Sequence, residues 1–360
     1  MSSDIPRTHS TILSSVDERF SRALDAGDLF FYPSSTHVHD EAGIEFQIRL
    51  CPALQKKPSS PTPQFTAEAS STTDSNQKTV DDDHDGQANK EAVKSKPDPF
   101  SPPYVPNLHI GELRDEDEEE EFAVLLNKFS VLPNHFLMVT REFKSQTEPL
   151  YPSELVQSYL FLDAAHKTGK NYFAFYNCGD VSGASQPHKH IQFIPVDDDG
   201  PPIEKLAKSV KLETEDKPFA INSIPFAVHV RRLPLYSSAT PKSSLEEALG
   251  EAFLTLLDLM HSTIWHSPSH PSGQPSYNVI LTRSHLYIAP RSREKHVLEK
   301  TGDELSVNAL GFAGMLLVKS EAELEAVKEE GVIKILKGVG VDSVHEKQIQ
   351  EPHETDDVLN

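Results

Sequence analysis

The stretch Gly179-Asp-Val-Ser-Gly-Ala-Ser-Gln-Pro-His-Lys-His-Ile-Gln-Phe-Ile194 carries most of the information about the fold and chemistry of this chain. In it, a turn of small and polar residues is followed by two histidines and a glutamine spaced two residues apart. Because successive side chains of a β-strand point to opposite faces, His188, His190 and Gln192 are predicted to share one face. Ile191 is then predicted to point into a core on the other face.

The turn and the strand together indicate chemistry on phosphate. A turn of this kind presents backbone N–H groups and short polar side chains to phosphate oxygens. An imidazole beside it can attack phosphorus, and a glutamine can hydrogen-bond phosphoryl oxygens but cannot titrate. Two histidines on one strand face could instead share a zinc ion, but the sequence offers no obvious third or fourth ligand. We therefore interpret the stretch as a site of phosphoryl or nucleotidyl transfer through a histidine.

The composition argues against several classes of partner. The formal net charge of the 360-residue chain is −21, which disfavours binding to nucleic-acid polymers and anionic membranes. Its two cysteines, Cys51 and Cys178, match no metal or redox spacing, which indicates a reducing compartment. The N-terminal residues show no signal peptide, and no segment approaches the roughly 18 apolar residues of a membrane span. We expect a cytoplasmic protein that could also enter the nucleus.

The hydrophobic pattern predicts more strands than helices. The strands are often joined by short connections and show no regular βαβ alternation. We therefore expect an α+β fold with a mostly antiparallel sheet flanked by helices. Helices are predicted at residues 11–26, 153–167 and 245–265 and after Ser320, and strands at 44–50, 122–131, 135–141, 172–176, 188–194, 226–233, 277–282, 286–290 and 312–318.

Composition also divides the chain into parts. Residues 58–97 are rich in Ser, Thr, Pro, Asp, Lys and Gln and contain few large apolar residues. Such a segment cannot bury enough apolar surface to offset its ordering entropy, so we interpret it as a disordered insert. Residues 342–360 form an acidic tail. We therefore expect one catalytic domain, built from residues 1–57 and 98–341.

Short motifs along the chain occur in the order typical of one known family. They are Cys51-Pro-Ala-Leu-Gln-Lys-Lys-Pro58, Leu126-Asn-Lys-Phe129, His135-Phe-Leu-Met-Val-Thr140, Tyr176-Asn-Cys-Gly179, the segment from Ser182 to Gln192, Ser276-Tyr-Asn-Val-Ile-Leu-Thr282, Pro290-Arg-Ser292 and Gly311-Phe-Ala-Gly-Met-Leu-Leu-Val-Lys319. With these motifs the chain resembles the fungal diadenosine tetraphosphate phosphorylases (ATP adenylyltransferases). That family belongs to the histidine-triad-like superfamily, on the branch shared with galactose-1-phosphate uridylyltransferase. The resemblance implies a histidine-triad-like fold.

The resemblance also implies roles for individual residues. His190 would attack the α-phosphorus and become adenylylated, His188 would support it through local hydrogen bonds, and Gln192 would hold the phosphoryl group. His135 and the other scattered histidines are assigned no role. The remaining matching positions would contact the nucleotides or their phosphates: Lys57, Asn127, Lys128, Asn177, Gly183, Ala184, Ser185, Gln186, Asn308, Gly311, Met315 and Lys319.

The implied reaction is ping-pong. Neutral His190 takes the adenylyl group of diadenosine tetraphosphate and releases ATP, and inorganic phosphate then accepts that group to give ADP. A divalent cation such as Mg²⁺ is expected to bind through the substrate phosphates. We expect neither an all-protein metal site nor an organic cofactor.

Three alternatives stay open. A hydrolase of the same superfamily would pass the adenylyl group to water, but such enzymes usually carry a third histidine where this chain has Gln192. A uridylyltransferase acting on sugar phosphates would typically add metal-binding cysteines and histidines. A non-catalytic dinucleotide-binding sensor is the alternative outside the enzymes. The sequence leaves the oligomeric state and the base preference undecided, although it favours a monomer.

Overall fold

Residues 5–56, 98–115, 119–197, 200–236, 240–267 and 273–343 are described by the structure, a computed structural model. Lys57, the insert predicted at 58–97 and all but the first two residues of the tail predicted at 342–360 lie outside the described residues. The disorder predicted for the insert therefore stays a prediction.

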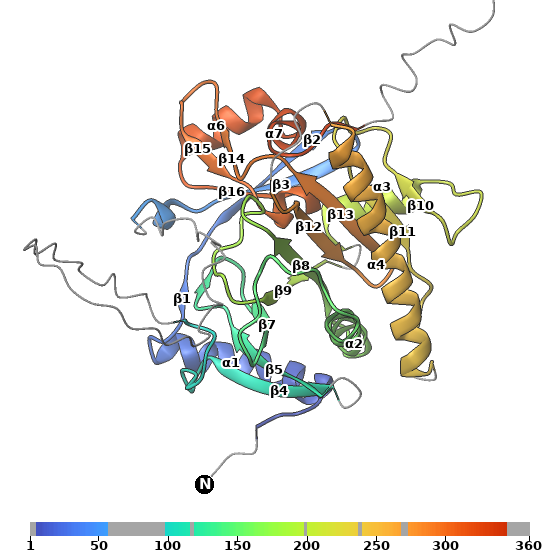
Figure 1. The fold of residues 1–360 in the computed structure, drawn as a ribbon. Coiled ribbons are helices and arrows are strands. Elements are labelled where there is room, and N and C mark those ends of the chain that lie inside the picture. The colour runs from blue at the N-terminus through green and yellow to red at the C-terminus, as the bar shows by residue number, and fades with distance from the viewer. Residues whose placement is uncertain are drawn as a thin grey trace, which may run out of the picture.

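A nine-stranded sheet, in the order β10-β11-β13-β12-β8-β9-β7-β5-β4, forms the centre of the fold (Figure 1). All its neighbouring strands pair antiparallel, which confirms the predicted α+β fold with a mostly antiparallel sheet. Its strands are β4 (His109–Asp115), β5 (Glu120–Leu126), β7 (Phe136–Thr140), β8 (Asn171–Cys178), β9 (His190–Val196), β10 (Pro218–Ala220), β11 (His229–Arg232), β12 (Ser276–Leu281) and β13 (His285–Arg291).

Three smaller sheets complete the strands. The largest of them has the order β16-β3-β2, in which β16 (Met315–Val318) runs parallel to β3 (Ile44–Leu50) and β2 (Ser35–Glu41) runs antiparallel to it. The alternating apolar residues of β3 are buried, as its sequence pattern predicts. The two-stranded sheets are formed by β1 (Phe30–Phe31) with β6 (Phe129–Ser130) and by β14 (Lys295–Val297) with β15 (Glu304–Ser306). The short 3-10 helix η1 (Pro52–Lys56) follows β3.

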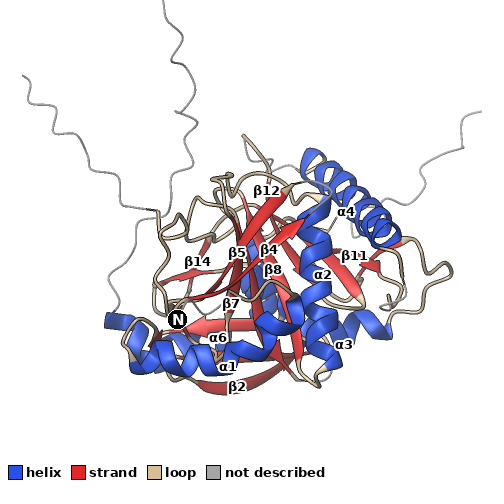
Figure 2. Cartoon of the chain, turned by 90° about the horizontal axis from the view of Figure 1, so that it is seen from below, coloured by secondary structure: helices blue, strands red, loops and turns tan. Residues whose placement is uncertain are grey.

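The large sheet separates the two largest hydrophobic cores of the described residues. On β9, Ile191 and Phe193 belong to one core and Ile194 to the other, as expected from alternating side chains. The first core is completed by α1 (His9–Asp25), α2 (Pro152–Lys167) and α4 (Lys242–Trp265). The second is completed by β3 and β16 with α3 (Pro202–Ser209), α5 (Ala309–Ala313), α6 (Glu321–Glu330) and α7 (Val332–Val339). Figure 2 shows the strands at the centre of the molecule with helices around them.

The strand predicted at 312–318 is wrong at its start. Phe312 lies in the short helix α5, and the strand begins only at Met315. Gly314 adopts φ 97°, a left-handed conformation that favours glycine, and it ends the helix there. An unbroken apolar run does not distinguish a short buried helix from a strand. Similarly, the strand predicted at 122–131 ends at Leu126, and β6 is a separate strand that pairs with β1.

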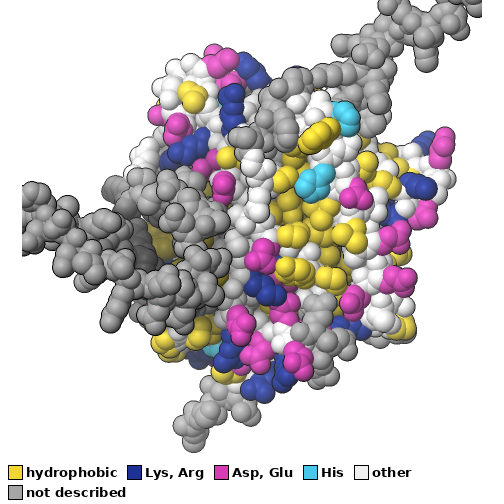
Figure 3. All heavy atoms as spheres, viewed as in Figure 1, with side chains coloured by type: hydrophobic (Ala, Val, Ile, Leu, Met, Phe, Trp, Pro, Cys, Tyr) yellow, Lys and Arg dark blue, Asp and Glu magenta, His cyan; other side chains and the backbone are white. Residues whose placement is uncertain are grey.

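Part of the long helix α4 faces outward. Leu254 and Trp265 are 63% and 75% exposed. Figure 3 shows hydrophobic side chains gathered on the face of the molecule that carries α4, with acidic and basic side chains interspersed elsewhere. Within the residues that the structure describes, no helix has the length and apolar character needed to cross a bilayer.

Candidate active site

His190 is the first residue of β9, which lies between β7 and β8. The ladder between β8 and β9 ends at the pair Phe175 and Gln192, so His190 lies just beyond the last paired position. At this position the buried side-chain amide of Gln146 replaces the backbone hydrogen bonds between β8 and β9. It accepts from the N–H of His190 at 2.8 Å and donates to the carbonyl oxygens of His190 at 3.3 Å and Asn177 at 2.8 Å. The backbone of the predicted nucleophile is thus fixed by a side chain that the sequence did not single out.

The hydrogen bonds of His190 determine which of its nitrogens is available. Its Nδ1 lies 2.8 Å from the carbonyl oxygen of His188, which can only accept, so Nδ1 carries the hydrogen. The lone pair is therefore on Nε2. His190 is only 2% exposed, and burial lowers its pKa to about 4, although the bond to His188 and the nearby carboxylate of Asp98 oppose this shift. The imidazole is neutral at physiological pH, as a nucleophile requires.

His188 holds a second segment against the strand. Its Nε2 donates to the carbonyl oxygen of Thr140 at 2.7 Å, and its Nδ1 lies 2.7 Å from Oδ2 of Asp98. Burial would raise the pKa of Asp98, but hydrogen bonds from Phe100 N, the Ser101 hydroxyl and His188 lower it overall. The ring of Phe100 then packs against His190 at a centroid distance of 5.0 Å. These contacts agree with a supporting role for His188.

The side chain of Gln192 is hydrogen-bonded to His135, a residue for which the sequence predicted no role. His135 Nε2 lies 3.2 Å from Gln192 Oε1, and His135 Nδ1 lies 2.9 Å from Nδ2 of Asn127. His135 is 8% exposed, and burial lowers its pKa to about 4. Predicting this contact would have required the knowledge that β7 pairs with β9.

The polar turn is packed tightly against the C-terminal part of the chain. Gly183 adopts φ 81°, and a Cβ there would lie 2.7 Å from the carbonyl oxygen of Val307 and 2.8 Å from Cβ of Asn308. Only glycine fits this position. Ala184 is buried, Gln186 is half-buried and Ser185 is exposed, so the last two can reach a ligand.

A buried network beneath the turn connects it to the C-terminal segment. Asn278 Nδ2 donates to Asn177 Oδ1 at 2.8 Å and to Ser182 O at 2.9 Å, and Ala309 N donates to the same Asn177 oxygen at 2.9 Å. Arg291 donates to Ser182 O at 3.1 Å and to Asn278 Oδ1 at 2.7 Å. The Nδ2 group of Asn177 is buried without a hydrogen-bond partner among the described residues. It is therefore a donor that a ligand can use.

Arg291 is a buried charge directly behind the predicted phosphate site. It is 0% exposed, and its remaining donors bind the carbonyl oxygens of Val339, Arg293 and Glu294. Burial lowers its pKa to about 9, with the Glu294 carboxylate opposing the shift. Arg291 belongs to the motif Pro290-Arg-Ser292, but no role was predicted for it from the sequence. A buried cation here favours anions bound at the turn.

The four predicted C-terminal residues lie together. Asn308, Gly311, Met315 and Lys319 all line one cavity of about 230 Å³. Asn308 caps α5 by accepting from Leu310 N at 3.0 Å, and the next residue, Ala309, reaches the Asn177 network. The structure therefore joins this cavity to the polar turn.

The predicted lysines differ in how the structure places them. Lys128 is exposed, and its ammonium lies 6.0 Å and 5.9 Å from the ring centroids of Phe30 and Phe129. Lys319 is exposed at the cavity just described. Lys57 lies outside the described residues, so its predicted contact with the polyphosphate stays a prediction.

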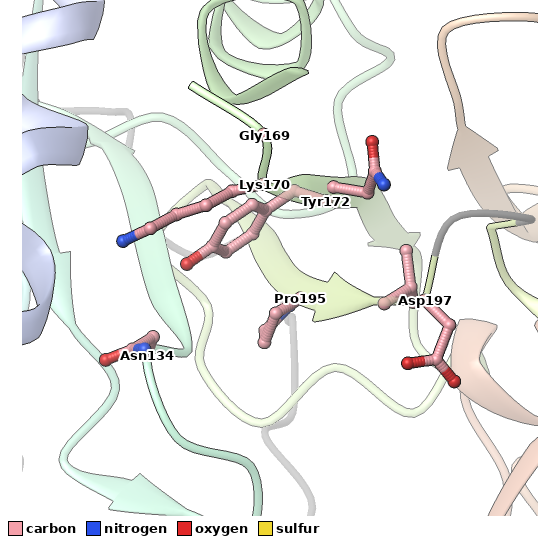
Figure 4. A pocket seen from close by; sticks show the side chains of 8 residues that line it. Asn134, Gly169, Lys170, Tyr172, Pro195 and Asp197 are labelled. Atoms are coloured by element: carbon pink, nitrogen blue, oxygen red, sulfur yellow. The ribbon is translucent and has the colours of Figure 1, made fainter. Parts of the chain in front are cut away.

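Another cavity, of about 410 Å³, is lined by residues that include Asn134, Lys170, Tyr172 and Asp197 (Figure 4). It lies where β8 begins and β9 ends, at the opposite end of β9 from His190. Its Lys170 forms an ion pair with Asp17 at 2.5 Å. Among the described residues, no group of three or more His, Cys, Asp or Glu side chains is placed to hold a metal ion.

Comparison with known proteins agrees with this geometry. A family model described as "Ap4A phosphorylase N-terminal domain" matches residues 71–209, and one described as "ATP adenylyltransferase C-terminal domain" matches residues 222–342. The Saccharomyces cerevisiae protein "Diadenosine 5',5'''-P1,P4-tetraphosphate phosphorylase 2" is 33% identical over 255 residues, which cover 68% of this chain and 75% of the relative. The chain belongs to the Ap4A phosphorylase (ATP adenylyltransferase) family. The predicted resemblance is confirmed.

Further similar proteins agree with this assignment. The Saccharomyces cerevisiae protein "Protein APA1" is 28% identical over 243 residues, or 65% of this chain and 72% of that relative. The crystal structure of yeast Ap4A phosphorylase Apa2 in complex with AMP has a TM-score of 0.69 at 25% identity and covers 94% of this chain and 98% of its own. The Apa2 complex with Ap4A has a TM-score of 0.68 at 26% identity, over 93% of this chain and 98% of its own. These matches confirm the predicted histidine-triad-like fold.

Proposed function

We propose that this chain cleaves diadenosine tetraphosphate (Ap4A) with inorganic phosphate and forms ADP and ATP through an adenylylated His190. The observation that carries the proposal is the Nδ1–H of His190 bonded to the carbonyl of His188, which leaves the lone pair of the neutral ring on Nε2, at the start of the strand that follows the polar turn. Family membership supports the substrate, because the yeast relative of which the chain covers 75% is a diadenosine tetraphosphate phosphorylase.

In the first step, Nε2 of His190 attacks the α-phosphorus. A bond forms between nitrogen and phosphorus, the bond from that phosphorus to the bridging oxygen breaks, and ATP leaves. The adenylylated ring carries a positive charge that Nδ1–H shares, so its hydrogen bond to the carbonyl of His188 strengthens as the intermediate forms. In the second step an oxygen of inorganic phosphate attacks the same phosphorus, the P–N bond breaks, and ADP leaves with His190 neutral again.

The nature of Gln192 favours phosphate over water as the acceptor. An imidazole at this position could take a proton from water, but an amide has no accessible pKa. Inorganic phosphate is already ionised and needs little help from a base. The adenylylated His190 should therefore persist until phosphate binds.

We propose that two groups of residues hold the anionic substrate. The first is the turn at Gly183–Gln186 with the buried Arg291, and the second is Lys319 with the cavity that Asn308 lines. These groups act where charge develops on the phosphoryl oxygens and on the leaving polyphosphate. A divalent cation such as Mg²⁺ would bind through the polyphosphate oxygens and neutralise part of their charge.

The cell compartment and the assembly state are also proposed. Cys51 and Cys178 are both buried and unpaired, which suits a reducing cytoplasm or nucleus. We expect the protein to act as a monomer, which light scattering on the purified chain would check.

The test is to incubate the purified protein with Ap4A, with and without inorganic phosphate, and to separate the nucleotides. We expect equal amounts of ADP and ATP, formed only when phosphate is present. The His190→Asn variant serves as the control for contaminating activity. Release of AMP and ATP without phosphate would identify a hydrolase, and binding without turnover would identify a nucleotide sensor.

A further inference from the structure

A chain of hydrogen-bonded side chains runs from the end of β5 to the glutamine beside the nucleophile, and its direction is fixed at one end. The N–H of Phe129 donates to Asn127 Oδ1 at 3.4 Å, and Asn127 Nδ2 donates to the carbonyl of Phe129 at 3.5 Å. A backbone N–H only donates and a carbonyl only accepts, so both contacts assign the amide of Asn127 the same way. Its NH₂ group therefore faces His135.

The orientation passes through His135 to Gln192. Asn127 Nδ2 lies 2.9 Å from His135 Nδ1, and because an amide NH₂ only donates, Nδ1 must accept. In a neutral imidazole the hydrogen is then on Nε2, which lies 3.2 Å from Gln192 Oε1. The oxygen of the Gln192 amide is thereby bound, and its NH₂ group is left to face another partner.

We propose that His135 is a positioning residue, which fixes the carboxamide of Gln192 so that its NH₂ group faces the phosphoryl group carried by His190. This inference rests on the proposed function, because it assumes that His190 becomes adenylylated. Without the bond to His135, the amide of Gln192 could turn by half a rotation. Its oxygen would then face the phosphoryl oxygens, where two acceptors repel each other.

The low exposure of His135 makes the arrangement stable. The ring is 8% exposed and also lies 6.3 Å from the ring of Phe175, centroid to centroid. Burial opposes protonation of the ring, and a protonated ring would place an Nδ1–H donor against the NH₂ group of Asn127. The neutral tautomer with hydrogen on Nε2 is therefore the one that satisfies all three side chains.

A double-mutant cycle separates positioning from general packing. His135→Phe keeps a planar ring but removes both hydrogen bonds, and Gln192→Ala removes the group that is positioned. We expect His135→Phe to lower kcat for phosphorolysis by about 10–100-fold, the usual effect of losing a well-placed hydrogen bond to a charged group. In the Gln192→Ala background the same substitution should lower kcat by less than about threefold, because nothing remains to be positioned.

His229→Phe is the matched control. His229 is also 8% exposed and hydrogen-bonds another side chain, since its Nε2 lies 2.9 Å from the Thr263 hydroxyl. It lies on β11, which four strands of the large sheet separate from β7, the strand that follows His135. This variant should lose stability to a similar extent as His135→Phe but keep its kcat.

Asn127→Asp provides a second route if His135→Phe does not fold. The carboxylate has no hydrogen to donate, so it draws the hydrogen of His135 to Nδ1 and turns Nε2 into an acceptor. The Gln192 amide would reverse. Because Asn127 is itself a predicted nucleotide contact, the informative quantity is the difference between backgrounds: kcat should fall by a larger factor in the wild-type background than in the Gln192→Ala background.

The outcomes are distinguishable. If the wild-type protein forms no ADP from Ap4A and phosphate, the proposed function is refuted, before the double-mutant cycle is measured. If the wild-type protein is active but His135→Phe lowers kcat equally with and without Gln192, the inference is overturned. An equal loss of kcat in His229→Phe would overturn it as well.

Discussion

A buried ion pair anchors the segment between the two histidines of the site, and removing one partner should strongly destabilise the protein. Lys189 Nζ lies 2.7 Å from Glu154 Oε2, and both side chains are 1% exposed. Nζ also donates to the carbonyl oxygen of Pro149 at 2.7 Å and lies 4.2 Å from the ring centroid of Tyr151. Glu154→Gln keeps the shape of the side chain but leaves the ammonium buried without a counter-ion.

The size of the effect follows from the burial. Removing one member of a fully buried ion pair costs about 3–5 kcal/mol. An unfolding entropy of roughly 2.1 cal/mol/K per residue corresponds to about 1.5 °C per kcal/mol for a chain of this size, so the melting temperature should fall by about 4–8 °C. The pKa of Glu154 is raised, because burial outweighs the attraction of Lys189, so the pair itself adds little net stability. Replacing both members, with Glu154→Leu and Lys189→Met, should therefore cost only about 1–2 kcal/mol.

Urea denaturation followed by far-UV circular dichroism measures these differences. The control is Lys205→Met, which breaks an exposed pair between Lys205 and Glu45 whose side chains are 66% and 58% exposed. The free energy of unfolding of that variant should fall by less than about 1 kcal/mol. A Glu154→Gln variant no less stable than the Lys205→Met control would refute the reasoning, as would a double variant that is less stable than Glu154→Gln.

Further predictions concern the site itself. His190→Asn should lose turnover by several orders of magnitude and no longer trap an alkali-stable phosphoramidate from labelled Ap4A; a labelled variant would contradict the assignment of the nucleophile. Gln192→His should add phosphate-independent release of AMP, because an imidazole can take a proton from water; unchanged products would argue against the reading of the glutamine. Gly183→Ala should raise KM for Ap4A, because a Cβ would lie 2.7 Å from the carbonyl oxygen of Val307 and would force the turn to move. An unchanged KM would mean that the turn can shift without affecting substrate binding. Burial lowers the pKa of His190 and of His135 from 6.5 to about 4. As pH falls, the unfolded chain binds protons at these histidines before the folded protein does. The stability of the folded protein is therefore highest above about pH 6.5, and its free energy of unfolding decreases by about 3 kcal/mol for each histidine as pH falls toward 4. Urea midpoints at pH 7, 5.5 and 4.5 check this, and a constant midpoint would contradict it.

The sequence predicted those parts of the site that depend on local periodicity. His190 and Gln192 share a face of β9 because alternation in a strand is fixed within a few residues. The same pattern could not predict that His135 contacts Gln192, since 57 residues separate them and the contact requires β7 to pair with β9.

Buried polar residues were missed for a related reason. Glu294 lies three residues after Arg291, but the guanidinium bonds to its carbonyl oxygen, and further bonds go to Ser182, Asn278 and Val339 in other segments of the chain. The start of β16 was placed too early, because the apolar residues before Gly314 fit a strand as well as a short helix. In each case the deciding contact is tertiary rather than local.

The contact of Gly183 with Asn308 has a consequence for what a fragment of this protein can do. One family model ends at residue 209 and the other begins at 222, yet the turn with Ser182 belongs to the first region and Asn278 and Arg291 belong to the second. A chain cut between the two regions would leave Asn177 and the carbonyl of Ser182 buried without their donors, at a cost of about 1–3 kcal/mol for each group. Neither half would retain partial activity. Activity should therefore appear only when the separate halves are mixed and reassociate. Turnover would then report directly on complementation between the two halves.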